Sequence, residues 1–126
     1  MIYNSLSGIP DDYKNTIASI IECLRDLDFI TEIYLFGSVA RLSIHVGSDV
    51  DILVVFEDNV DHKTARRAVL HKLADLDTVI EYDLLTRKTS EINLKDKFMS
   101  KVWEEKICLL ERGEFTNGCE QLLRIC

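Results

Sequence analysis

The sequence has no long apolar run and almost no proline. No stretch approaches the roughly 20 apolar residues that a membrane-spanning helix requires. The opening residues, MIYNSLSGIPDDY, lack the basic and apolar regions of a signal peptide. Pro10 is the single proline, and there is no internal repeat, low-complexity segment or linker-like stretch. These absences predict one cytoplasmic domain of 126 residues, without membrane association, that can bury a single core.

Paired cysteines and excess basic charge are also absent. The four cysteines, Cys23, Cys108, Cys119 and Cys126, show no paired-ligand spacing, which excludes the usual patterns of zinc sites and disulfide frameworks. Lysine and arginine number 15 against 22 acidic residues, for a net charge of −7. Because general affinity for nucleic acid depends on a basic surface, we expect no direct binding of DNA or RNA. The excess of carboxylates suits either ordinary solubility or the binding of divalent metal ions.

Helix and strand signals alternate along most of the chain. Pro10 is expected in the first turn of a helix, where its missing N–H costs little, and Ser38 and Asp61 are expected N-caps. After Asp51 the chain is almost continuously apolar to Phe56, as in a strand covered on both faces. The expected helices cover residues 10–28, 38–44, 61–75 and 90–104, and the expected strands cover residues 32–36, 49–56, 78–85 and 106–110. This order predicts an α/β (α+β) fold in which helices flank a small mixed β-sheet.

Two aspartates, Asp49 and Asp51, stand at the start of the second expected strand. Because side chains alternate along a strand, both carboxylates point to the same face. Carboxylates this close repel each other unless solvent, a cation or protonation relieves the repulsion. Carboxylate oxygens suit Mg²⁺, which commonly completes its coordination shell with water and substrate phosphates. The pair therefore indicates a magnesium site, although a solvated strand start would show the same pattern.

A Gly-Ser pair, Gly37-Ser38, follows the first expected strand. A glycine lets a phosphate approach the backbone, and free N–H groups at the start of the following helix favour an anion. The same pair is typical of an ordinary strand-to-helix turn with a serine N-cap. Combined with the two aspartates, it predicts a nucleotide site.

Three further positions have open roles. A third carboxylate would complete a two-metal site, and Glu81 and Asp83 share one face of the third expected strand, so spacing does not choose between them. Arg41 could reach a triphosphate or form a surface salt bridge. Ser48 could contact the nucleotide or cap the turn into the strand.

The stretch GSVAR…SDVDILVV, with ten residues between Ser38 and Asp49, resembles the signature of the DNA polymerase β-like nucleotidyltransferase superfamily. The short chain is similar to the minimal nucleotidyltransferase branch of that superfamily. In that branch the third aspartate lies in a strand that ends like VDLVT. The stretch YDLLT matches this strand end and has Asp83 at the position of the aspartate. The stretch VWEEKICLLERG resembles the final helix and strand of the branch. One departure is Leu42, where the family often has glycine, and this affects the loop more than the ligand set.

The resemblance, which covers roughly Glu32 to Gly113, implies a polymerase β-like nucleotidyltransferase fold. We expect the nucleotidyltransferase domain over residues 1–113 and, because the apolar pattern fades after Gly113, a tail or short helix over residues 114–126. It implies that Gly37 and Ser38 hold the β- and γ-phosphates of ATP, and that Asp49 and Asp51 ligate two Mg²⁺ ions. Asp83 would ligate the catalytic ion and help to deprotonate the acceptor hydroxyl.

Members of this branch are often encoded beside a HEPN ribonuclease toxin, and in studied cases they attach AMP to a toxin tyrosine. The resemblance therefore implies a protein adenylyltransferase that acts as an antitoxin and forms a hetero-complex or homo-oligomer. One alternative is an antitoxin that binds nucleotide without catalysis and neutralises its partner by contact. Another is a small-molecule adenylyltransferase, a class that usually carries an additional substrate-binding domain.

Overall fold

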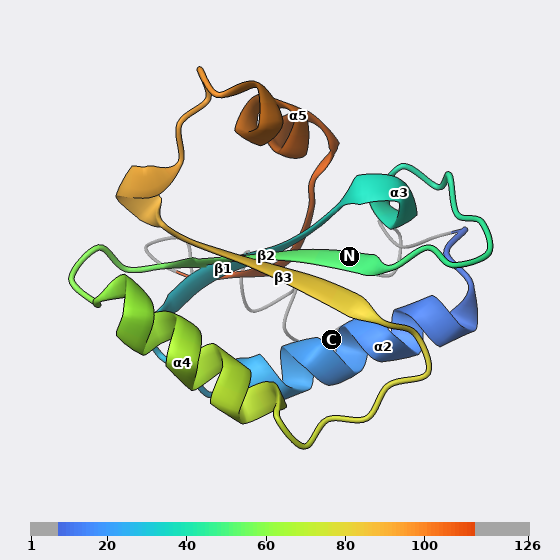
Figure 1. The fold of residues 1–126 in the computed structure, drawn as a ribbon, viewed down its shortest axis with the longest axis horizontal. Helices are drawn as coiled ribbons and strands as arrows, with labels where there is room; N and C mark the ends of the chain where they lie inside the picture. The colour runs from blue at the N-terminus through green and yellow to red at the C-terminus, as the bar shows by residue number, and fades with distance from the viewer. Residues whose placement is uncertain (1–7, 113–126) are drawn as a thin grey trace.

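The computed structural model describes residues 8–112, which form a four-stranded mixed sheet with helices on both faces (Figure 1). The strands lie in the order β3-β2-β1-β4, with β1 antiparallel to β2 and β4, and β2 parallel to β3. The strands are β1 (Ile30–Phe36), β2 (Val50–Phe56), β3 (Tyr82–Lys88) and β4 (Ile107–Glu111). The helices are α2 (Asp11–Leu24), α3 (Gly37–Ala40), α4 (His62–Leu73) and α5 (Lys97–Glu105), with a 3-10 turn at Thr89–Glu91. The predicted small mixed sheet flanked by helices is confirmed.

Each face of the sheet packs against different helices. Helices α2 and α4 cover one face, and α5 lies over the other (Figure 1). The larger core joins Ile17 and Val69 to Ile52 and Val54 of β2, whereas Leu53 and its neighbours pack against α5. All residues from Ile52 to Phe56 are fully buried, so the prediction that this strand is covered on both faces is confirmed.

Helix α2 presents an apolar stripe to the core and ends earlier than expected. Ile17, Ile20 and Leu24 are buried, as their helical spacing predicts. Pro10 is the N-cap in extended conformation rather than a first-turn residue, and the helix ends at Leu24 instead of near Asp28. Helix α4 likewise ends at Leu73, two residues before the expected end.

The short helix α3 differs most from the sequence expectation. The prediction that Ser38 is its N-cap is wrong, because the N-cap is Phe36, without a side-chain cap hydrogen bond. The helix is only four residues long and is followed by a turn at Leu42, which has a positive φ of 61°. Glycine occupies this left-handed region without strain, whereas a side chain costs roughly 1–2 kcal/mol there. The departure at Leu42 therefore falls where the backbone favours glycine.

The boundaries of the later strands and helices also differ from those expected from the sequence. Strand β3 begins at Tyr82, which pairs with Val50, whereas the preceding Val79 is 82% exposed and pairs with no strand among residues 8–112. Helix α5 begins at Lys97 because Asp96 caps it by accepting the Met99 N–H at 2.9 Å. The cap at Asp61 is confirmed by its hydrogen bond from the Thr64 N–H.

Strand β4 lies one residue beyond the expected range. The expected tail at 114–126 lies outside the described residues, and the domain boundary at residue 113 stays a prediction. Within residues 8–112, no helix has the length and apolar character needed to cross a membrane.

Candidate active site

The strand register brings two of the predicted carboxylates side by side. Strands β2 and β3 run parallel, and Asp51 pairs directly with Asp83. Both side chains therefore emerge on the same face of the sheet. This is the face covered by α5, because Leu53, two residues after Asp51, packs in the α5 cluster. Of the two candidates in the third strand, Asp83 is the one that faces Asp51 across the sheet; Glu81 is exposed and precedes β3.

Gly37 is required by its close contact with Asp51. Its φ is +80°, and a Cβ added to it would lie 2.1 Å from the Asp51 Oδ2 and 3.0 Å from the carboxylate carbon. No side chain fits at this distance. The absence of a Cβ at Gly37 thus lets the Asp51 carboxylate approach the backbone where β1 passes into α3.

A third carboxylate, Glu105 at the end of α5, completes the contacts around Gly37. Its Oε2 accepts the Gly37 N–H at 2.6 Å and a hydrogen bond from Arg41 Nη1 at 2.8 Å. The salt bridge predicted as one role of Arg41 is therefore present, with Glu105 as its partner. Glu105 is not among the residues predicted from the sequence, because one residue of a Glu-Glu pair at a helix end has no distinctive spacing.

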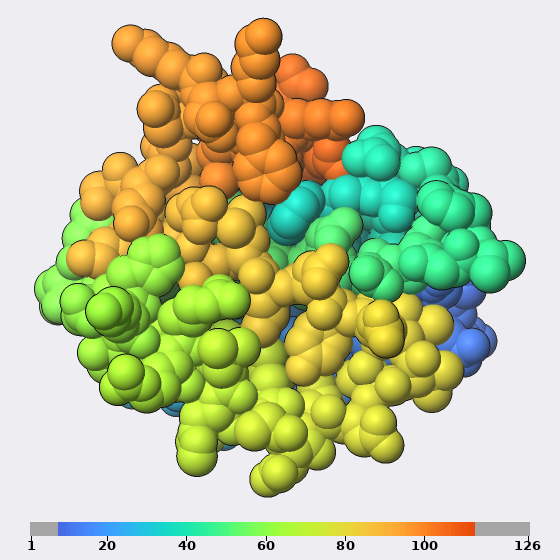
Figure 2. All heavy atoms as spheres, viewed as in Figure 1, coloured from blue at the N-terminus to red at the C-terminus, as the bar shows by residue number. Residues whose placement is uncertain are grey.

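These groups line one cavity of about 480 Å³ between α5, α3 and the ends of β2 and β3. Figure 2 shows this face hollowed between the orange atoms of α5, the teal atoms of α3 and the yellow atoms of β3. The polar or charged part of the lining consists of Gly37, Arg41, Asp51, Asp83, Lys101 and Glu105. The apolar part includes Phe36 and Phe98, whose rings meet edge to face with centroids 6.2 Å apart. A cavity of this size and mixed character suits a small-molecule ligand.

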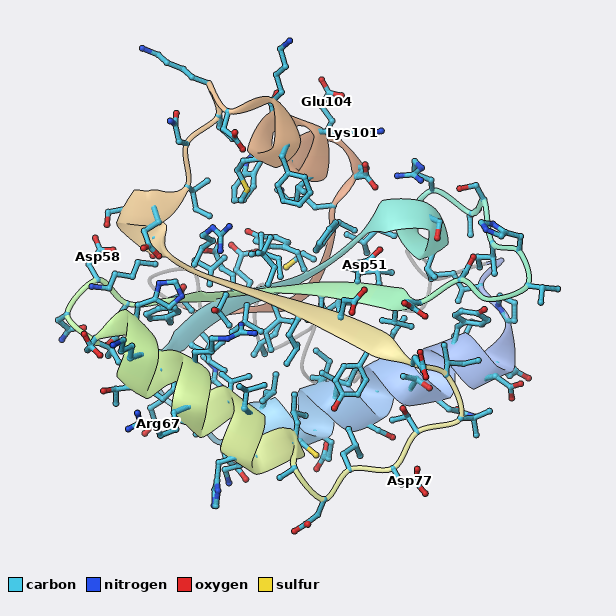
Figure 3. All side chains as sticks on the ribbon, in the orientation of Figure 1. Asp51, Asp58, Arg67, Asp77, Lys101 and Glu104 are labelled. Atoms are coloured by element: carbon cyan, nitrogen blue, oxygen red, sulfur yellow. The ribbon has the colours of Figure 1, made fainter. Side chains whose placement is uncertain are left out.

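Negative charge is concentrated in the cavity. Burial, followed by the charges of Asp83, Asp49 and Glu105, raises the pKa of the Asp51 carboxyl from its ordinary 3.8 to about 6. The Arg41 guanidinium opposes this shift in pKa. Figure 3 shows Asp51 on the sheet below α5, with Lys101 and Glu104 on the helix above it.

The remaining predicted residues lie beside the cavity rather than in its lining. Asp49 is half-buried just before β2, and its charge acts on Asp51. Ser38 lies in α3, where its backbone carbonyl accepts the Ser43 N–H at 2.9 Å. Ser48 is buried and its hydroxyl accepts the His45 N–H at 2.9 Å, as expected of a turn cap. Nucleotide contacts for Ser38 and Ser48 stay predictions.

The cavity has two adjacent carboxylates that bear on its fit to magnesium. Within residues 8–112, no three His, Cys, Asp or Glu side chains are arranged so that they could hold a metal ion together. Asp51 and Asp83 offer adjacent carboxylates, and the raised pKa of Asp51 reflects burial first and then repulsion from neighbouring carboxylates, which a cation would relieve. Because Mg²⁺ is usually held by one or two carboxylates together with substrate phosphates, these two residues fit it by donor chemistry. The assignment of Asp49, Asp51 and Asp83 as ligands stays a prediction.

Residues 17–109 match a family model described as a nucleotidyltransferase domain, a range that contains every cavity-lining residue. No curated protein sequence matches the chain significantly.

Several solved structures share the fold. A toxin–antitoxin structure with AMP-PNP is 22% identical, with a TM-score of 0.54 over 86% of this chain and 85% of that one. A chain in the structure of a tri-AMPylated Shewanella oneidensis HEPN toxin in complex with MNT antitoxin is 20% identical, with a TM-score of 0.52 over 90% of this chain and 85% of that one. A toxin–antitoxin structure named MntA-HepT is 21% identical, with a TM-score of 0.51 over 89% and 81%. At these identities the similarity shows a common fold.

Proposed function

Because the chain belongs to the nucleotidyltransferase domain family, we propose that it transfers AMP from ATP, with Mg²⁺, to a tyrosine of a HEPN toxin and so acts as its antitoxin. The observation that carries this proposal is the pairing of Asp51 with Asp83 in a cavity that also contains Gly37 and Arg41. The structural neighbours support the choice of acceptor, since one is an AMPylated HEPN toxin with an MNT antitoxin and another contains AMP-PNP.

The cavity provides the groups that this reaction needs. Arg41 supplies positive charge for the phosphates of ATP, and Asp51 and Asp83 would hold magnesium, with Asp49 close enough to contribute charge. When bound, magnesium neutralises the triphosphate and the charge that develops on the leaving pyrophosphate.

Asp83 is exposed and lines the cavity, so its carboxylate is available to an incoming hydroxyl. It takes the proton as the tyrosine oxygen attacks the α-phosphorus in line. The new O–P bond forms while the bond to the β-phosphate oxygen breaks, and pyrophosphate leaves.

The test is transfer of label from α-labelled ATP to the product of the neighbouring gene, with Mg²⁺ present. Asp51→Asn and Asp83→Asn should each lower transfer by on the order of 100-fold or more, the loss typical when a group that stabilises transition-state charge is removed. Asp77→Asn makes the same chemical change at an exposed residue outside the cavity and should leave transfer unchanged (Figure 3).

Absence of label transfer by the unaltered protein, or equal transfer by Asp51→Asn, would refute an adenylyltransferase. The same variants separate catalysis from simple binding. If Asp49→Ala/Asp51→Ala loses transfer yet still neutralises the toxin fully, the protein acts by stoichiometric contact.

A further inference from the structure

Glu105 accepts hydrogen bonds from two donors in the cavity lining, the Gly37 amide and Arg41. A single oxygen, Oε2, accepts both the Gly37 backbone N–H and the Arg41 guanidinium, at 2.6 and 2.8 Å. The Glu105 side chain is only 11% exposed, whereas that of Arg41 is 43% exposed and borders solvent. A backbone N–H and a guanidinium converging on one anionic oxygen is an arrangement that a phosphate oxygen would also satisfy.

We propose that the Glu105 carboxylate is an internal substitute for a nucleotide phosphate, holding the Gly37 amide and Arg41 until the nucleotide displaces it. This inference rests on the proposed function, because it assumes that the nucleotide's outer phosphates use these donors. Glu105 would then compete with nucleotide for the site.

The geometry makes the two anions mutually exclusive. Gly37 has one N–H, and at 2.6 Å that N–H is fully committed to Glu105. A phosphate oxygen can take the same donor only if the carboxylate leaves. The cavity also holds Asp51 and Asp83, so a triphosphate entering beside an undisplaced Glu105 would face a third carboxylate.

Glu105 has a means of leaving. It is the last residue of α5, and the backbone turns to extended conformation at Lys106, so its flexible side chain lies at a helix end. Lys101, four residues earlier on the same helix, lines the same cavity. Residues four apart on a helix are neighbours, so Lys101 can pair with the displaced carboxylate.

Competition by Glu105 predicts a selective pattern of affinities. Removing the carboxylate should strengthen binding of ligands whose phosphates use Gly37 and Arg41, namely AMP-PNP and inorganic pyrophosphate. AMP, which lacks the β- and γ-phosphates, should be unaffected. The gain should be about fivefold, the factor that corresponds to the net contribution of one ordinary hydrogen bond.

The experiment measures binding of AMP-PNP, pyrophosphate and AMP to the full chain by calorimetry with Mg²⁺. Glu105→Ala should bind the first two ligands about fivefold more tightly than the unaltered protein. Glu105→Gln, which keeps the shape but loses the charge, should give a smaller gain in the same direction. Glu104→Ala removes the same charge from the adjacent, exposed residue and is the matched control; it should change none of the affinities.

Weaker or unchanged nucleotide binding by the Glu105 variants would overturn the inference. If Glu105→Ala and Glu105→Gln bind AMP-PNP equally or more weakly, Glu105 positions Arg41 for the nucleotide and does not compete with it, which overturns the inference. If no variant binds AMP-PNP, the proposed function fails, and pyrophosphate then tests the inference alone. Tighter binding of pyrophosphate by Glu105→Ala would still support the inference, and unchanged or absent binding would overturn it.

Discussion

Replacing Asp51 by asparagine should stabilise the metal-free protein at neutral pH, although it removes a residue that the proposed reaction needs. Burial, together with the neighbouring Asp83, Asp49 and Glu105 charges, raises the pKa of the Asp51 carboxyl from 3.8 to about 6. At pH 7.5 the folded protein must keep this carboxyl ionised against that opposition. Asparagine has nearly the same shape without the charge.

The magnitude follows from the pKa shift. A change of about two units corresponds to about 3 kcal/mol if taken in full. Because Asp51 is only half-buried, solvent screening reduces this to about 1 kcal/mol. Because the pKa of Asp51 is raised in the folded protein, the folded state favours the neutral carboxyl. The contribution of Asp51 to the free energy of unfolding is therefore fully present below pH 3.8 and is lost as the pH rises through about 6. Asp51→Asn should therefore gain stability across this window and keep the gain above it.

Urea unfolding in EDTA at pH 7.5 and at pH 3.5 measures the effect. The variant should unfold at higher urea than the unaltered protein at pH 7.5, and the difference should shrink at pH 3.5, where both side chains are neutral. Asp77→Asn serves as the control for a change of charge at an exposed position. Equal or lower stability of Asp51→Asn at pH 7.5 would refute the electrostatic reasoning.

Three backbone substitutions can be checked by thermal unfolding, and the first also by AMP-PNP binding. Gly37→Ala should lower stability by roughly 2 kcal/mol or more and lose AMP-PNP binding, because its Cβ would strike Asp51 in addition to straining the backbone. Gly47→Ala also has a positive φ but its Cβ would meet nothing within 4 Å, so it should cost only about 1 kcal/mol; equal costs at both positions would contradict this explanation. Leu42→Gly should raise stability by up to about 1 kcal/mol by relieving the left-handed backbone, and a clear loss would show that its side-chain contacts dominate.

The order of elements and their type followed from the sequence, whereas several boundaries did not. Apolar and β-branched composition identified β2 correctly to within one residue, and every position from Ile52 onward is buried. It failed at β3, where Val79 is β-branched but exposed, and the strand starts at Tyr82 because only there does it pair with β2. Propensity describes a residue's own preference, and pairing is decided by the neighbouring strand.

The candidate site was predictable where its residues are close in sequence. Gly37 and Asp51 stand out by spacing, and the structure brings both into contact. The choice between Glu81 and Asp83 needed the register of two strands, which local patterns do not contain. Glu105 could not be found from spacing, since 68 residues separate it from the Gly37 amide to which it binds.

The antiparallel register between β1 and β4 explains why Glu105 reaches Gly37. Leu35 pairs with Ile107, so two steps further along β1 and two steps back from β4 bring Gly37 opposite Glu105. The end of β1 thereby meets both the start of β4 and the start of β2, where Phe36 pairs with Asp51.

The junction between α5 and β4 is held by a separate aromatic cluster. The Lys106 Nζ lies 4.7 Å from the ring centroid of Tyr34 and 4.6 Å from that of Trp103, and the two rings meet edge to face. These contacts fix the backbone immediately after Glu105 and leave its side chain as the movable part. The strand register thus places the Glu105 carboxylate beside the Gly37 amide. Replacement of this carboxylate by a phosphate requires rotation of one side chain rather than rearrangement of the sheet.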